Sequence, residues 1–211
     1  MRPLLPHQHK ALDYCKGRKH IALFMHMRLG KTKVIIERFR KQQSTVNSIL
    51  VIAPITTLYS WQDELKIEGE SSISLLLGNY KNRVKQLNLH SRWNLINYEG
   101  LLVIPDILKR RWGLVVVDES AKLRNPMTEI SKLIANELDH VPFKAILSGL
   151  PAPESPLDYF QQFKFLYGKF LGFTNFWKFR GVTCIQAGYD WVLKSKFKKL
   201  LKSEVHKLSF I

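Results

Sequence analysis

The stretch "MHMRLGKT", residues 25 to 32, follows a short apolar run and ends in Gly-Lys-Thr. A turn of this kind at the start of a helix points backbone N–H groups at an anion, and its lysine reaches phosphate oxygens. The complete pattern G-x-x-x-x-G-K-[ST] would place glycine at position 25, where this chain has methionine. The tripeptide alone therefore leaves two alternatives open, a phosphate-binding loop with an altered entrance and a simple turn that begins a helix.

Short apolar segments alternate with longer helix-like segments along the chain. The apolar ones are rich in Ile, Val and Leu, as buried strands are, and cover residues 20–25, 48–54, 72–78, 93–99, 113–120 and 144–151. The helix-like ones cover residues 31–42, 57–67, 80–90, 101–110 and 128–138. This alternation predicts an α/β fold with a mostly parallel central sheet and helices on both faces.

Side chains suited to nucleotide chemistry follow several of these apolar segments. Because ligands of a parallel sheet bind beyond the carboxyl ends of its strands, we expect these side chains to converge. Gly30 would let the backbone approach a phosphate, Lys31 would reach phosphate oxygens, and Thr32 would place a hydroxyl on Mg²⁺. Asp118 is suited to holding Mg²⁺, and Glu119 to orienting and deprotonating a water molecule. An acidic start to the next helix is the alternative interpretation of these two acids.

Basic residues dominate the composition. The chain has 33 Lys and Arg against 17 Asp and Glu, a formal net charge of +16. A field of this sign favours a polyanionic partner, so we expect nucleic acid; a merely basic soluble domain is the alternative. The late segment "LKSKFKKLLKSEVHKL" (193–208) is typical of an amphipathic basic helix or a basic tail.

The sequence has neither a long apolar run nor the pattern of a secretory leader. No stretch of 18 apolar residues occurs, and the first ten residues lack an apolar core. The two cysteines, Cys15 and Cys184, stand in no CxxC or metal-ligand spacing. We therefore expect no membrane partner and a cytoplasmic (intracellular, reducing) location.

In their order and spacing, the motifs resemble the first RecA-like lobe of a superfamily 2 helicase-type ATPase, in the Swi/Snf-like DNA translocase branch. The segments that carry this resemblance are "LLPHQHKAL" (4–12, glutamine motif), "MRLGKT" (27–32, motif I), "ILVIAPITTLYSWQDEL" (49–65, motif Ia), "LINYEGL" (95–101, the N-Y-E segment), "VVVDESAKLRNP" (115–126, motif II) and "AILSGLPAPESPLDYFQQFKFL" (145–166, motif III and its helix). The resemblance continues through residues 173–182 and covers nearly the whole chain. It implies a RecA-like P-loop domain that binds ATP and Mg²⁺ and works on DNA.

The resemblance also implies a role for individual residues. Nucleotide binding falls to Gln8, which would read the adenine edge, and to Arg28, Leu29, Gly30, Lys31 and Thr32. Lys31, Asp118 and Glu119 would be catalytic, with Thr32 and Asp118 on Mg²⁺. Ser148 and Gly149 would couple the ATP state to movement of the lobe, and Thr56, Thr57, Asn97 and Tyr98 would line a DNA track. For the last four, ordinary loop or packing positions are the alternative, and packing is the expected role of Trp61.

Four positions depart from the family pattern. Met25 replaces a glycine on which this branch does not depend, and Arg28 replaces a usual glycine and adds a cation beside the phosphates. Ala121 and Leu150 are apolar where the family has histidine and threonine. We expect these two to pack against each other and to alter the coupling between ATP and DNA.

The expected division of the chain is an ATP-binding lobe at residues 1–166 and a basic, aromatic-rich extension of that lobe at residues 167–211. The family uses a second RecA-like lobe that brings arginines to the γ-phosphate, and no second set of strands follows in these 211 residues. We therefore expect a second lobe supplied in cis or in trans, and weak or no ATP hydrolysis by this chain alone.

Two other functions compete with a helicase-like ATP hydrolase. One is a basic DNA-binding module with a degenerate nucleotide site, which would tend to lose the Lys31–Thr32–Asp118–Glu119 set that is retained here. The other is a different P-loop enzyme, such as a nucleoside kinase, which would not require "LINYE" or "SGLPAPESPLDYF".

Overall fold

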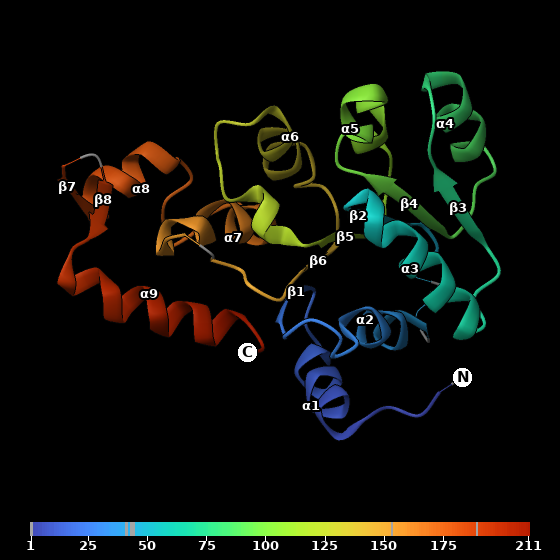
Figure 1. The fold of residues 1–211 in the computed structure, drawn as a ribbon, viewed down its shortest axis with the longest axis horizontal. Helices are drawn as coiled ribbons and strands as arrows, with labels where there is room; N and C mark the ends of the chain where they lie inside the picture. The colour runs from blue at the N-terminus through green and yellow to red at the C-terminus, as the bar shows by residue number, and fades with distance from the viewer. Residues whose placement is uncertain (1, 41, 43–44, 153, 189) are drawn as a thin grey trace.

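The six predicted strands form one sheet (Figure 1) in the computed structural model, which describes residues 2–40, 42, 45–152, 154–188 and 190–211. They are β1 (His20–Phe24), β2 (Ile49–Ala53), β3 (Ile73–Leu76), β4 (Trp93–Asn97), β5 (Leu114–Asp118) and β6 (Phe143–Ser148). The strand order is β1-β6-β5-β2-β4-β3, and every pairing in this sheet is parallel. The predicted α/β fold with a parallel central sheet is thus confirmed. Residues 41 and 153, which fall inside two predicted segments, lie outside the described residues.

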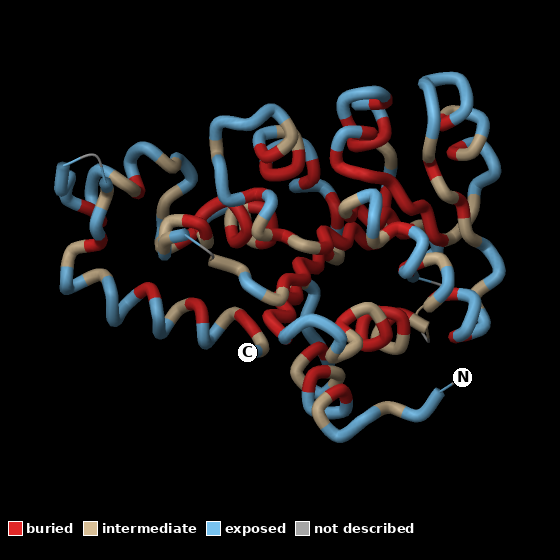
Figure 2. Tube along the Cα trace, viewed as in Figure 1, coloured by how far each residue is buried: buried red, intermediate tan, exposed pale blue. Residues whose placement is uncertain are grey.

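Helices cover both faces of the sheet because successive strand residues point to opposite sides. Residues 49, 51 and 53 of β2 belong to one apolar cluster and residues 50 and 52 to another. The first cluster includes residues of α1 (Pro6–Cys15), α2 (Lys31–Arg40) and α3 (Ile55–Ile67). The second includes residues of α4 (Tyr80–Leu87), α5 (Gly100–Val103), α6 (Glu129–Glu137) and α7 (Tyr159–Tyr167). Figure 2 shows the buried residues concentrated in the strands and on the inner sides of these helices.

The predicted helix over residues 101–110 is interrupted. The chain forms α5 and then a 3₁₀ helix, η1 (Pro105–Lys109), with Ile104 between them at φ −130° and ψ 66°. A proline lacks a backbone N–H and disfavours helical geometry in the residue before it, so Pro105 ends α5. Two other 3₁₀ helices are present in the described residues. η2 (Ser120–Leu123) follows β5, and η3 (Pro156–Asp158) directly precedes α7.

The C-terminal part packs on the same core. It comprises α8 (Phe176–Thr183), an antiparallel hairpin of β7 (Cys184–Ala187) and β8 (Asp190–Leu193), and the basic helix α9 (Ser195–Leu208). The sequence indicated α9, whereas the hairpin was not predicted. After α9 the chain returns to edge strand β1, where the Phe210 N–H donates to the Ala22 carbonyl at 2.9 Å and the Phe24 N–H donates to the Phe210 carbonyl at 2.8 Å. Phe170, Phe179 and Leu201 belong to the same apolar cluster as residues of the sheet. The expected boundary at residue 166 stays a prediction.

None of the helices in the described part of the chain combines the length and the apolar character needed to span a bilayer. Cys15 and Cys184 are both buried free thiols. Burial raises the pKa of Cys15 to about 12, so this thiol stays protonated at neutral pH.

Candidate functional site

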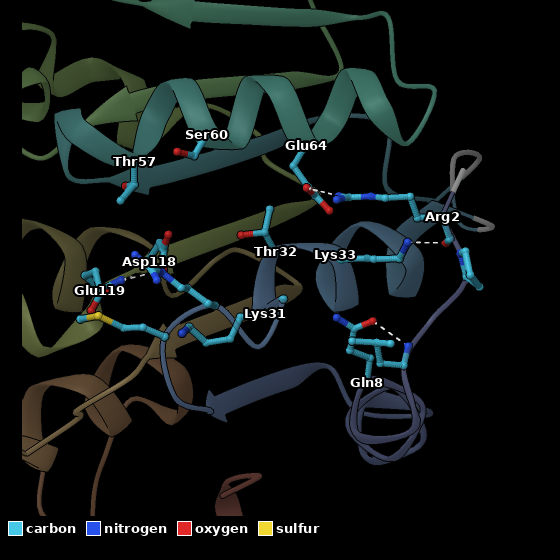
Figure 3. Close-up of a pocket in the computed structure, with 15 residues that line it drawn as sticks. Arg2, Gln8, Lys31, Thr32, Lys33, Thr57, Ser60, Glu64, Asp118 and Glu119 are labelled. Carbon is cyan, nitrogen blue, oxygen red and sulfur yellow. Dashed lines mark hydrogen bonds and ion pairs between the residues drawn. The ribbon is translucent and has the colours of Figure 1, made fainter.

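One pocket gathers side chains from the ends of β1 and β5 (Figure 3). Both strands pair with β6, which brings their carboxyl ends to the same edge of the sheet. The start of α2, one side of α3 and the first residues of the chain complete the walls. The pocket has a volume of about 780 Å³, within the range of small-molecule sites. Predicted site residues that line it are Gln8, Arg28, Gly30, Lys31, Thr32, Asp118 and Glu119, with Thr57 beside them.

The loop between β1 and α2 has a backbone that only a few residue types adopt easily. Gly30 has φ 77° and Arg28 has φ 65°, both in the left-handed region. A Cβ added to Gly30 would lie 2.2 Å from Nε2 of Gln8, so glycine is needed for space as well as for its φ. Gln8 holds the loop, because its Nε2 donates to the Leu29 carbonyl at 3.2 Å while its Oε1 accepts the Leu5 N–H at 2.9 Å. Leu29 thus contributes a backbone oxygen to the loop instead of lining the pocket.

Lys31 is buried at the base of the pocket. Its ammonium donates to the carbonyl oxygens of Met25 at 3.0 Å and His26 at 3.3 Å, both in the loop itself. No carboxylate forms an ion pair with it among the described residues. The charge can therefore turn to an incoming anion without leaving a buried carboxylate unpaired.

Asp118 ends β5 with both carboxylate oxygens bound. Oδ2 accepts the indole N–H of Trp61 at 2.8 Å, and Oδ1 accepts the backbone N–H of Glu119 at 2.9 Å. Burial raises the pKa of this carboxyl, while these two hydrogen bonds and the charge of Lys31 oppose that rise in pKa. Asp118 lines the pocket, and each of its oxygens can accept or ligate further, which suits Mg²⁺ because this ion prefers oxygen ligands.

Glu119 follows with backbone angles of φ 51° and ψ 51°, which is unusual for a glutamate. Its side chain is half-buried in the pocket, and no hydrogen bond or ion pair of the described residues engages its carboxylate. Burial raises its pKa, and the neighbouring charge of Asp118 raises this pKa further. A free carboxylate with a raised pKa is suited to accept a proton from a bound water molecule.

A second lysine of α2 has a different environment. Lys33 is buried and binds the Glu68 carboxylate at 2.9 Å, and it also donates to the Arg2 carbonyl. Arg40 binds the other oxygen of Glu68 at 3.1 Å. Burial alone would raise the pKa of Glu68, but the hydrogen bonds from Lys33 and Arg40 outweigh it and lower that pKa. This cluster ties α2 to the end of α3, and Lys33 also lines the pocket.

The predicted coupling residues lie at the end of β6, next to the loop. Ser148 is fully buried, and its hydroxyl oxygen accepts the Leu150 N–H at 3.2 Å. A Cβ on Gly149 would lie 3.2 Å from the Met27 side chain, so this glycine allows close contact with the phosphate-loop segment. Leu150 is 61% exposed, and its expected packing against Ala121 stays a prediction.

The four predicted DNA-contacting residues do not share one surface. Thr56 is exposed, whereas Thr57 lines the pocket and donates to the Pro54 carbonyl at 2.9 Å. Asn97 is buried between Arg83 and Glu99, at 3.0 and 2.7 Å. Tyr98 is buried and donates its hydroxyl to the Asp118 carbonyl at 2.7 Å. Their role as DNA contacts stays a prediction.

The sequence did not indicate several residues of the site, among them the pocket-lining Arg2, Lys33, Ser60 and Glu64 and two buried residues that bind its parts, Trp61 and Gln162. Trp61 was interpreted as packing, yet its N–H binds Asp118. Gln162 is fully buried; its Oε1 accepts the Ser120 hydroxyl at 2.7 Å, and its Nε2 donates to the Pro151 carbonyl. This amide joins the segment after Asp118 to the loop after β6. A polar residue inside the apolar run of α7 was the available signal for Gln162, and for Trp61 the only signal was its place within the motif Ia segment at residues 49–65.

Comparison with known families gives a match over most of the chain. Residues 7–206 match the SNF2-related domain. The chain superposes on the Sulfolobus solfataricus SWI2/SNF2 ATPase core in complex with dsDNA with a TM-score of 0.83 and 25% sequence identity. This superposition covers 99% of the chain and 44% of that structure's chain.

Curated relatives are similar over shorter stretches. DNA excision repair protein ERCC-6-like 2 of Mus musculus is 30% identical over 101 residues, which is 45% of this chain and 6% of that protein. Chromatin remodeling factor mit1 of Schizosaccharomyces pombe is 27% identical over 186 residues, or 77% of this chain and 13% of that protein. The chain thus spans only a small part of the length of these relatives.

Proposed function

The chain belongs to the SNF2-related domain family, and we propose that these residues form the ATP-binding lobe of a DNA-dependent, helicase-like ATPase of the translocase type. One observation carries the proposal. The Gly30–Lys31–Thr32 turn and the Asp118–Glu119 pair, far apart in sequence, line the same pocket at the carboxyl edge of a parallel sheet.

The residues present fit Mg²⁺ and a nucleoside triphosphate. The first amide N–H groups of α2 have no acceptor within the helix, which favours an anion at this end of it. Lys31, which donates to two neutral carbonyls, would donate to phosphate oxygens in their place. Arg28 adds a second cation to the same rim. Bound Mg-ATP would supply the phosphoryl group for transfer to water.

The acidic side of the pocket would hold the metal and prepare the water. Asp118 and the Thr32 hydroxyl are the proposed protein ligands of Mg²⁺, which usually keeps water and phosphate oxygens in its other positions. Glu119, with its raised pKa and free carboxylate, would orient the attacking water and accept its proton. Gln8 would present its amide to the adenine edge from the opposite wall (Figure 3).

Ser148 and Gly149 are proposed to report the state of the nucleotide to the rest of the lobe. Gly149 contacts the Met27 segment of the phosphate loop. The link through Gln162 joins Ser120 to the loop that follows Gly149. A shift in either loop would therefore change the position of α7, which carries Gln162.

DNA is the proposed macromolecular partner, and the S. solfataricus structure to which this chain is similar was determined with dsDNA. The exposed face of α9 supplies a concentrated positive surface. Lys198, Lys199 and Lys202 are exposed there, and none of the ion pairs among the described residues engages them. Cations without carboxylate partners can neutralise DNA phosphates at no cost in broken ion pairs. Thr56 is exposed at the start of α3 and is proposed as a further contact, with Thr57, Asn97 and Tyr98 behind it.

We also propose that a second RecA-like lobe, in cis or in trans, completes the site, and that these 211 residues alone hydrolyse ATP slowly or not at all. The cations that line the pocket come from the first 33 residues. An arginine delivered to the γ-phosphate raises rates by about 10³–10⁵ in related phosphoryl transfers. We also propose that the protein is located in a reducing compartment of the cell, because Cys15 and Cys184 are free, buried thiols.

A basic DNA-binding module with a degenerate nucleotide site is the second candidate function, which the charge of +16 favours. The ATPase lobe should bind nucleotide in a Mg²⁺-dependent way, whereas a DNA-binding module with a degenerate site should not. A fluorescent ATP analogue should bind the native chain more tightly with Mg²⁺ than with a chelator, and Asp118→Asn should remove that difference. DNA binding by the native chain with no nucleotide binding, even with a second lobe added, would favour the module.

A further inference from the structure

Trp61 uses its only polar side-chain atom on the carboxylate of Asp118. The residue is 1% exposed, and its indole Nε1 lies 2.8 Å from Asp118 Oδ2. A hydrogen bond from a fixed donor to an ionised acceptor is stronger than a neutral one, and it restricts the rotation of the carboxylate. The opposite oxygen is fixed by the Glu119 N–H at 2.9 Å. The plane of the carboxylate is therefore set by one bond from α3 and one from its own chain.

The neighbouring Trp93 shows that burial alone does not require such a bond. Its ring lies 6.4 Å from the ring of Trp61, between centroids, and it is fully buried in the same apolar cluster. Its Nε1 is buried without a hydrogen-bond partner among the described residues. Two adjacent tryptophans thus fill the same core, and only one of them also binds an acidic side chain of the pocket.

Trp61 is buried on α3 next to the residues of this helix that line the pocket. Thr57, Ser60 and Glu64 line the pocket from this helix, at spacings of three to four residues that put them on one side. Trp61 lies in the same stripe and reaches Asp118 underneath it. The indole N–H therefore joins one wall of the pocket to the carboxylate at its base.

We propose that Trp61 is a positioning residue of this site, whose indole N–H holds the Asp118 carboxylate in the orientation that presents its free lone pairs to Mg²⁺. The proposal rests on the Mg-ATP site proposed above. It differs from a packing role in a measurable way. Both phenylalanine substitutions remove part of a buried indole from the same apolar cluster, whereas the bond to Asp118 is lost only at position 61.

Calorimetric titration of a non-hydrolysable ATP analogue over a series of Mg²⁺ concentrations, and in chelator, tests the proposal on the native chain, Trp61→Phe and Trp93→Phe. Removing a residue that orients a metal ligand typically weakens metal affinity by about 10- to 100-fold. We expect the Mg²⁺ concentration for half-maximal enhancement to rise by about that factor in Trp61→Phe. We expect no change in Trp93→Phe, and equal analogue affinity for all three chains in chelator.

Equal Mg²⁺ dependence of the two variants would overturn the role of Trp61 while leaving the nucleotide site intact. A native chain without Mg²⁺-dependent binding would instead contradict the proposed function itself. If Trp61→Phe does not fold, benzothienylalanine at position 61 keeps the bicyclic shape and replaces the N–H with sulfur. The same rise in the Mg²⁺ requirement is expected for that chain, and its absence would overturn the proposal.

Discussion

Lys31 and Lys33 lie two residues apart at the start of α2, and both are buried, yet their ammonium groups have opposite surroundings. Lys31 rests on two backbone carbonyls at the base of an open pocket. Lys33 is bound to the Glu68 carboxylate, which Arg40 also binds. A buried cation with a carboxylate partner holds the fold together, whereas one with only neutral partners is available to a ligand.

The glutamates of the two regions differ in the same way. Hydrogen bonds hold the pKa of Glu68 below its ordinary value in spite of burial, whereas burial and the charge of Asp118 raise the pKa of Glu119. One carboxylate is stabilised in its charged form by its neighbours, and the other is not. Both lysines line the pocket, but the ammonium of Lys31 has only neutral partners, whereas that of Lys33 is paired with a carboxylate.

The largest effect on stability is expected from Glu68→Ala. The change leaves Lys33 charged and buried without its partner, which typically costs about 3–5 kcal/mol. Urea unfolding of the native chain and the variant measures the loss. Glu64→Ala is the matched control, because Glu64 is in the last turn of α3, just before Glu68, but pairs with the exposed Arg2, and such a pair contributes about 1 kcal/mol or less.

The same variant has a defined pH dependence. A lowered folded-state pKa means that the stability from Glu68 is present above its unfolded value of 4.5 and is lost as the pH falls through the folded pKa. The gap in unfolding free energy between the native chain and Glu68→Ala should therefore narrow on acidification below pH 4.5. A gap that stays constant down to the acid limit would show that Glu68 is not held by charge.

Exposed lysines form a third class. Replacing them with alanine should weaken DNA binding and leave the fold unchanged. Alanine at Lys198, Lys199 and Lys202 removes three candidate phosphate contacts from α9. The slope of log affinity against log salt for duplex DNA should then decrease by about 3, because each contact contributes about 0.9. A triple variant at Lys66, Lys81 and Lys85, exposed on α3 and α4, is the control of equal charge. Equal slopes for both triple variants would mean that α9 has no special role.

Gly30→Ala should cost about 1–2 kcal/mol, since an alanine at φ 77° is strained. The new Cβ would also displace Gln8 from the loop. Gly181→Ala is the control, because this glycine is in α8, a Cβ added there would meet no atom within 4 Å, and the variant should be about 1 kcal/mol more stable. Thermal unfolding of both variants should therefore show shifts of opposite sign.

Glu119→Gln should give the smallest change in stability, a slight gain. A raised folded-state pKa means that Glu119 contributes stability below its unfolded value of 4.5, and that this contribution is lost as the pH rises through the folded pKa. The glutamine variant should therefore be the more stable chain at neutral pH and match the native chain in acid. A variant that is less stable at neutral pH would contradict the absence of a bound partner for this carboxylate.

Much of the fold could be predicted because its strands are continuous apolar runs, most of them ended by Gly, Pro or polar residues. The break at Pro105 and the β7–β8 hairpin were not predicted, since one depends on a single proline and the other on short, mostly exposed strands. The Gly-Lys-Thr turn indicated Lys31, but nothing in "LGKTKVII" shows that Lys33 binds Glu68, because that contact spans 35 residues. The bond from Trp61 to Asp118 likewise depends on how α3 packs beside β5.

The proposed role of Lys31 as a ligand-binding cation is tested most directly by calorimetric titration of a non-hydrolysable ATP analogue with Mg²⁺. Lys31→Ala would be compared with the native chain and with Lys132→Ala, which changes an exposed lysine on α6. We predict binding by the native chain and the control, and a loss of about 10- to 100-fold or more in Lys31→Ala with no change in its unfolding midpoint. Unaltered binding by Lys31→Ala, or a lower unfolding midpoint of that variant, would contradict the assignment of Lys31 to the ligand.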